Sequence, residues 1–228
     1  MKKLMTIAVT AFMSLTSTAQ QENLNVSENG EKVNVPESIQ ILNAAGILVQ
    51  YGYAQESALP LIQAVEIYQN LVAEGTRSGV KTSESDESAI EESKQNNISF
   101  EIDVLLKDAT KFADGDEHLI ALIDELKNNS TRGATKNYET HYDRVNAKST
   151  DTYTIRFRGN ETACVIVSGD GDTDLDLYIY DENGNLVESD TDSLDQCVCS
   201  WVPKWTGSFK IKIKNLGKVY NRYALIIN

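Results

Sequence analysis

The sequence lacks the patterns that usually carry catalysis. It contains no Gly-x-Ser-x-Gly nucleophile elbow, no His-Glu-x-x-His zinc motif, no glycine-rich phosphate loop and no dinucleotide-binding fingerprint. Only two histidines occur, and His118 has no supporting catalytic partner in the sequence. No spacing singles out a carboxylate pair for glycoside hydrolysis. We therefore expect a protein that is not an enzyme.

Cysteine is scarce as well. The three cysteines are Cys164, Cys197 and Cys199, and an odd number leaves at least one unpaired. Cys197 and Cys199 are too close in sequence for a comfortable mutual disulfide. Two alternatives stay open: a bridge from Cys164 to one of the other two, or three free thiols in or near strands. A zinc site is not expected, because neither histidine lies at ligand spacing from a cysteine.

Long apolar runs are absent after the first residues of the chain. Residues 1–19 combine Lys2 and Lys3 with an uncharged stretch and a small-residue end, which predicts a secretory signal peptide cleaved near Ala19. No later stretch is long and apolar enough to span a bilayer. We expect a secreted or periplasmic protein without stable membrane insertion.

Positive charge is in the minority. The formal net charge is −13, and loss of the two lysines of the leader makes it more negative. Such a chain repels the phosphate backbone, so nucleic-acid binding is not expected. An acidic surface suits solubility, cations or basic partners.

The first half of the chain has helical periodicity. Apolar residues recur at helical spacing between residues 37 and 73 and again between 100 and 126, which predicts about four helices. Residues 20–35 are expected to be a flexible N-terminal segment. Residues 36–130 then form a helical region, interrupted by a polar linker at 76–97 that has too few apolar side chains to order a core. A second linker is expected at 131–150.

The last third of the chain changes to a period of two. Alternating apolar and polar residues predict about seven strands, each with one buried face, over 151–228. The expected fold class is therefore α+β and multidomain, with the helical region followed by an antiparallel β-sandwich.

Aspartates concentrate where one of these strands begins. Within Gly169–Leu177 they recur at alternate positions, so their carboxylates repel unless water or a cation intervenes. Calcium prefers six to eight oxygen ligands, and it is a possible cofactor here. The alternative is that the aspartates cap turns. The metal candidates are Asp170, Asp172, Asp174, Asp176, Asp190 and Asp192.

The same region resembles a known family. The segments 167–181, 197–207 and 219–225, including Asp-Leu-Asp-Leu-Tyr from Asp174, look like the bacterial pre-peptidase C-terminal domain, and the resemblance covers roughly 153–228. It implies a jelly-roll-like sandwich attached to secreted proteins, with binding or secretion-linked roles and calcium sites in some relatives. Those domains usually follow a catalytic unit, whereas here a helical region precedes the sandwich.

Two surfaces could receive a partner. Trp201 and Trp205 could present an aromatic platform to sugar or peptide, although tryptophans in such a loop more often close the end of a sandwich. Lys210, Lys212 and Lys214 form a stripe that is a solvated strand face or a docking surface for an acidic partner.

These features predict an exported, non-enzymatic binding or assembly module. Its sandwich would dock a protein or an extracellular polymer and could bind calcium. Its helices would act as a spacer or would present the sandwich to the partner. Two alternatives stay open. One is a secreted hydrolase or protease-associated protein with carboxylates and His141 in a cleft, and the other is a structural envelope component.

Overall fold

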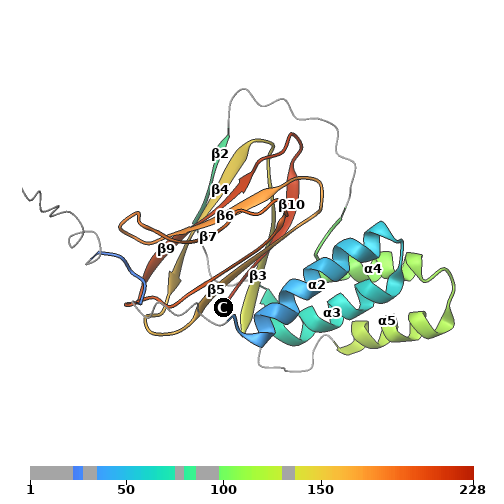
Figure 1. The fold of residues 1–228 in the computed structure, drawn as a ribbon. Helices are drawn as coiled ribbons and strands as arrows, with labels where there is room; N and C mark the ends of the chain where they lie inside the picture. The colour runs from blue at the N-terminus through green and yellow to red at the C-terminus, as the bar shows by residue number, and fades with distance from the viewer. Residues whose placement is uncertain (1–22, 28–34, 75–79, 86–97, 130–136) are drawn as a thin grey trace, which may run out of the picture.

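The computed structural model describes residues 23–27, 35–74, 80–85, 98–129 and 137–228. Within these residues, four helices lie against a sandwich of two five-stranded sheets (Figure 1). The predicted α+β class, with helices followed by an antiparallel β-sandwich, is confirmed. The predicted signal peptide lies outside the described residues.

The helices form two consecutive hairpins. They are α2 (Glu37–Ala54), α3 (Ala58–Leu71), α4 (Ile102–Phe112) and α5 (Glu117–Asn129). Pro36 stands just before α2, and its carbonyl accepts the first amides of that helix. The carboxylate of Asp116 accepts the amides of His118 and Leu119 and caps α5.

The strands form two sheets, which we call sheet A and sheet B. Sheet A has the order β1 (Val72–Glu74), β3 (Tyr138–Val145), β10 (Asn221–Ile227), β5 (Ala163–Gly169) and β8 (Gln196–Trp201). Sheet B has the order β2 (Val80–Ser85), β4 (Ser149–Phe157), β9 (Gly207–Asn215), β6 (Leu175–Tyr180) and β7 (Leu186–Asp190). The β1–β3 pair is parallel, and the other neighbours are antiparallel. From β3 onward the chain crosses between the sheets at every connection except the β6–β7 hairpin, which lies within sheet B, as in a jelly roll.

Both segments expected to be linkers contribute strands. The polar segment 76–97 contains β2, and the segment 131–150 contains β3 and the start of β4. β2 pairs only with β4, at the edge of sheet B, where polar side chains are tolerated because one side of the strand is not paired. The connection between α3 and α4 therefore supplies an edge strand to each sheet. The helical region and the sandwich are interleaved along the chain.

The described residues form two hydrophobic cores, one on each side of sheet A. One core fills the space between the sheets, and the other lies between sheet A and the helices. Cys164, Ile166, Ala224 and Ile226 face the helices, so β5 is buried along its whole length. The prediction of one buried face per strand is therefore wrong for β5 and β10. Each fully buried aliphatic side chain contributes about 1.5 to 3 kcal/mol to stability.

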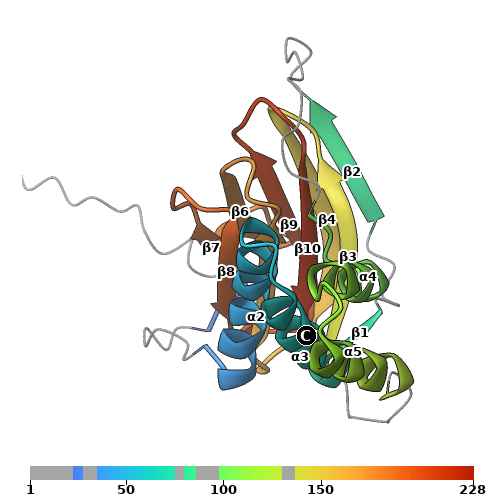
Figure 2. The same ribbon diagram turned by 90° about the vertical axis from the view of Figure 1, so that its right-hand side faces the viewer.

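The two outer faces of the sandwich differ. The helices lie beside β3, β5 and β8 of sheet A (Figures 1 and 2). In the part of the chain that the structure describes, no helix lies on the outer side of sheet B. Within the described residues, helices therefore cover one of the two outer faces of the sandwich.

Candidate functional site

The aspartate-rich turn fastens α2 to the sandwich. Asp170 is fully buried, and its carboxylate accepts the amide of Arg222 at 2.7 Å. Asp195, which the sequence did not single out, accepts the amide of Gly171 and, at 2.9 Å, the side-chain amide of Gln50 on α2. Gln50 also donates to the carbonyl of Gly169 at 2.7 Å. The turn therefore holds backbone amides of the sandwich and the side chain of Gln50, which fixes α2 against it.

The remaining metal candidates point in several directions. Asp176 accepts the hydroxyl of Tyr178 at 3.0 Å, Asp190 accepts the amide of Val198 at 2.9 Å, and Asp192 accepts the amide of Leu194 at 2.8 Å. Asp172 donates its backbone amide to Asp170. Partial burial, and then the charges of Asp176, Asp192 and Asp195, raise the pKa of Asp174.

These residues do not fit a preformed calcium site. Calcium needs several converging oxygens, and the described residues contain no group of three or more His, Cys, Asp or Glu side chains able to hold a metal ion. Carboxylate oxygens of Asp170, Asp190 and Asp192 accept backbone amides instead. The turn-capping alternative matches this geometry, and calcium binding stays a prediction.

The three cysteines lie on opposite faces of sheet A. Cys164 faces the helices and contacts the hydroxyl of Ser200 at 3.4 Å, whereas Cys197 and Cys199 belong to the core between the sheets. A bridge would have to cross the sheet, and all three thiols are free. The structure therefore agrees with the alternative of three free thiols and corrects the alternative of a bridge from Cys164. Burial raises the pKa of each thiol, which lowers its reactivity.

The two tryptophans have different roles. Trp201 is only 1% exposed and packs against Phe157 and Phe209 in the core, so it cannot present a ligand surface. Trp205 is 36% exposed, and its ring nitrogen donates to Glu182. Asn25 exchanges hydrogen bonds with the backbone of Trp205 at 3.1 Å.

The N-terminal segment is partly fixed by this contact. Asn25 is fully buried, and its amide donates to Asp181 at 3.0 Å, while the amide of Ser27 donates to the carbonyl of Val202 at 2.9 Å. Residues 23–27 are therefore attached to the end of the sandwich, which corrects the expectation of flexibility for this part of the segment 20–35. The contact also occupies part of the surface beside Trp205.

A charged cluster inside one end of the sandwich was missed from the sequence. Lys81 on β2 lies 2.7 Å from Asp143 and 2.9 Å from Asp151, and Tyr223 donates to Asp151 at 2.8 Å. Burial alone would raise the pKa of Asp143, but hydrogen bonds from Lys81 and Arg144, together with the charge of Lys81, hold it below its usual value. His141 lies beside Tyr153, with ring centroids 6.3 Å apart. This cluster joins the edge strand β2 to both sheets.

The outer face of sheet B gathers cations and tyrosines. Phe209, Ile211 and Ile213 of β9 point into the core, so the intervening lysines point outward. The strand register places Tyr178 and Tyr180 of β6 beside Lys212 and Lys210, and it places Thr154 of β4 on the other side of Lys210. We call the following set the basic face: Arg156, Tyr178, Tyr180, Lys210, Lys212 and Lys214.

The cations of the basic face form no ion pairs with the described residues. Lys210, Lys214 and Arg156 are exposed, and no ion pair joins any of the four cations to a described carboxylate. Lys212 lies 5.4 Å from the ring centroid of Tyr180, which stacks on Tyr178 at 6.5 Å. In a chain of net charge −13, this is a local concentration of positive charge, with Asp176 of β6 beside Lys214 at one end.

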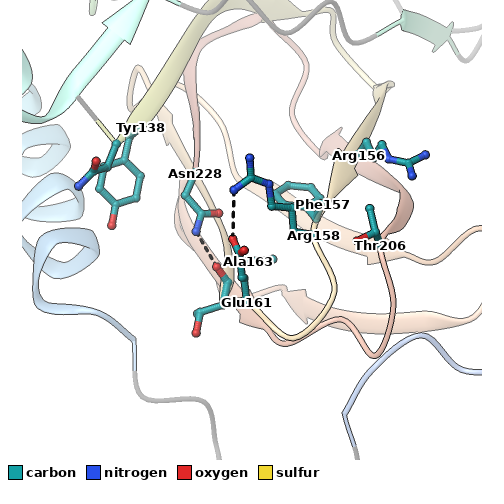
Figure 3. A pocket seen from close by; sticks show the side chains of 10 residues that line it. Tyr138, Arg156, Phe157, Arg158, Glu161, Ala163, Thr206 and Asn228 are labelled. Carbon is teal, nitrogen blue, oxygen red and sulfur yellow. Dashed lines mark hydrogen bonds and ion pairs between the residues drawn. The ribbon is translucent and has the colours of Figure 1, made fainter. Parts of the chain in front are cut away.

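A polar pocket lies at the end of the sandwich next to Arg156. Its volume is about 600 Å³, and it is lined by Arg156, Arg158, Glu161, Thr206 and Asn228, among others (Figure 3). Arg158 lies 3.7 Å from Glu161, and both side chains are mostly exposed. Because Arg156 belongs to both sets of residues, the pocket continues the basic face.

Comparison with known proteins gives no family. No protein-family model matches the chain, and no curated protein matches it. The resemblance to the pre-peptidase C-terminal domain therefore stays a prediction. No helix among the described residues is long and apolar enough to cross a membrane.

The similar solved structures are distant. One is PliG of Aeromonas hydrophila, a periplasmic lysozyme inhibitor of g-type lysozyme, with 12% identity and a TM-score of 0.33 over 40% of this chain and 84% of that one. Another is a carbohydrate-binding module of Cellvibrio mixtus lichenase 5A, in complex with cellotriose, with 10% identity and a TM-score of 0.26 over 39% of this chain and 86% of that one. CapF, in complex with an inhibitor, has 11% identity and a TM-score of 0.24 over 56% of this chain and 42% of that one. Likenesses this weak carry no functional argument.

Proposed function

We propose that the protein is an exported, non-enzymatic binding module that docks an anionic partner on the basic face of sheet B. The observation that carries the proposal is the contrast between the two outer faces. Helices cover sheet A, whereas sheet B presents cations that form no ion pairs with the described residues. Cations on a rigid sheet lose little conformational freedom in their backbone when they bind.

The chemistry of the interior agrees with a binding role. The cluster of Lys81, Asp143 and Asp151 is partly buried, and its polar atoms are used in mutual contacts between strands. The aspartate-rich turn similarly holds Gln50 and backbone amides. In this proposal both clusters stabilise the scaffold, and the basic face meets the partner.

The proposal is tested by removing charge from one face at a time. The face variant is Lys210→Gln, Lys212→Gln, Lys214→Gln, and the matched control is Lys107→Gln, Lys111→Gln, Lys127→Gln, whose lysines are exposed on α4 and α5. Both variants change the net charge equally. Biolayer interferometry would use immobilised polygalacturonate, heparin, poly-glutamate and neutral dextran.

The wild type and the control variant should bind at least one of the three polyanions and should not bind dextran. The face variant should lose at least about tenfold in affinity, which corresponds to about 1.4 kcal/mol. Binding should also weaken with added salt, since exposed charges are screened. Equal binding by the face and control variants, or no binding to any polyanion, would contradict the proposal.

A further inference from the structure

We infer that the anionic partner is an acidic polysaccharide and that the pocket beside Arg156 holds one of its carboxylate-bearing sugars. The inference rests on the proposed function and specifies its ligand. It combines two observations: the composition of the basic face, and a polar pocket lined by two arginines at its end.

The composition of the basic face suits a carbohydrate. Alternate residues of a strand lie about 7 Å apart, so the lysines of β9 form a regular row that can follow an extended, repeatedly charged chain. Tyr178 and Tyr180 add flat rings beside that row. The C–H face of a sugar ring packs on such an aromatic ring, and the hydroxyl of Tyr178 is held by its hydrogen bond to Asp176.

The same face is poorly suited to a protein or a nucleic acid. The centre of a protein interface is usually apolar, and most exposed large apolar side chains of the described chain lie on the helices and loops, with Leu186 of β7 bordering the basic face. A nucleic acid has a dense row of phosphates, which the net charge of −13 repels. A polymer with more widely spaced carboxylates can still contact the lysines, and the net negative charge of the protein repels it less.

The pocket has the size and polarity of a sugar site. Ligand pockets commonly span about 300 to 1,000 Å³, and this one measures about 600 Å³. Figure 3 shows Arg156 and Arg158 from β4 and the residues that follow it, with Thr206 on the adjacent segment before β9. A guanidinium group can donate two parallel hydrogen bonds to one carboxylate, which favours a uronate over a neutral sugar.

Glu161 makes the pocket testable by a gain of affinity. Its carboxylate lies 3.7 Å from Arg158, and the two side chains are 63% and 80% exposed, so the pair is easily replaced by a ligand carboxylate. Glu161 also repels an incoming anion. Glu161→Gln should therefore increase affinity for an acidic sugar, whereas a merely structural ion pair would give no such increase.

The experiment is calorimetric titration with trigalacturonate and with its neutral methyl ester. The wild type should bind the acid and not the ester, and Arg156→Gln, Arg158→Gln should lose at least about tenfold in affinity. Glu161→Gln should gain about twofold to fivefold. The lysine face variant should keep most of its trisaccharide affinity and lose polygalacturonate, because the longer chain is the one that reaches the β9 row. Circular dichroism would confirm that each variant is folded.

Three results would overturn the inference. They are equal binding of acid and ester, unchanged binding after loss of both arginines, and weaker binding after Glu161→Gln. Face-dependent binding of poly-glutamate, without binding of any uronate, would reject the polysaccharide and leave the proposed function standing. Absence of face-dependent binding to every polyanion would reject both.

Discussion

In both sheets, side chains alternate between the core of the sandwich and an outer face, but the two outer faces lie in different environments. On sheet A, the outward residues of β5 include Cys164 and Ile166, and α2 covers them. On sheet B, the outward residues of β9 are three lysines, and no described element covers them. One face contributes to folding, and in our proposal the other binds the partner. The difference can be tested by changing matched residues on each face.

The largest difference in stability is expected between Ile166 and Lys212. Ile166→Ala removes buried methyl groups between sheet A and α2, and should lower the free energy of unfolding by about 2 to 4 kcal/mol. Lys212→Ala should change it by less than about 0.5 kcal/mol. Urea denaturation measures both. Equal effects would show that the two faces have the same structural role.

The next largest effect is expected in the partly buried charged cluster. Lys81→Met leaves Asp151, which is 1% exposed, without its cation, and should cost about 2 to 4 kcal/mol at pH 7. Lys127→Met, in an exposed pair with Asp124, should cost less than about 0.5 kcal/mol.

The effect of Lys81 should depend on pH. The folded-state pKa of Asp143 is lower than its ordinary value of 3.8, so its stabilising contribution is present above that pH and is lost as the pH falls through the lowered pKa. The difference between wild type and Lys81→Met in urea denaturation should therefore shrink below about pH 4. A difference that stays constant down to pH 2 would contradict this assignment.

A moderate effect is expected where α2 meets the aspartate-rich turn. Gln50→Ala leaves the carbonyl of Gly169 and a carboxylate oxygen of Asp195 without this donor, and should cost about 1 to 2 kcal/mol. Gln63→Ala, on an exposed position of α3, is the control and should be nearly neutral. Thermal denaturation would compare them, and equal melting temperatures for the two variants would exclude the proposed fastening role.

The smallest effect on stability is expected at Asp174. Its pKa is raised in the folded state, so the charged form is disfavoured, and the cost appears as the pH rises through the raised pKa. Asp174→Asn should stabilise the protein at pH 7 by less than about 1 kcal/mol and have no effect well below pH 3.8.

Calorimetry with calcium and then EDTA belongs with this measurement. If the turn binds no calcium, the melting temperature should not change. A calcium-dependent rise that Asp174→Asn abolishes would establish a metal site, because a ligand that binds only the folded state raises that temperature.

The sequence predicts the helices and the core strands better than it predicts the edge strands and which strand faces are covered. Helical periodicity and the alternation of Phe209, Ile211 and Ile213 locate helices and core strands correctly. β2 escapes prediction because its inward residues, Lys81 and Ser83, are polar and are stabilised only by partners on other strands. β5 has apolar residues on both of its faces. This pattern indicates that a further layer covers the outer face of the strand, which the alternation alone does not indicate.

Only part of the candidate site could be predicted from the sequence. The lysine stripe of β9 follows directly from its alternation, but its neighbours depend on strand pairing across the sheet. Arg156 and Thr206 lie 50 positions apart and meet only in the folded protein. The aspartate-rich turn had the strongest sequence signal, and in the structure its carboxylates mainly accept hydrogen bonds from backbone amides and from Gln50.

Lysine footprinting on the unmodified protein tests the docking face most directly. The chain would be acetylated at low ionic strength with and without polygalacturonate, and labelling at each lysine would be read by mass spectrometry. The account predicts that the polymer protects Lys210, Lys212 and Lys214 on β9, while Lys107, Lys111 and Lys127 on the helices react as before. Protection of the helix lysines, or equal labelling of both sets with and without the polymer, would contradict it.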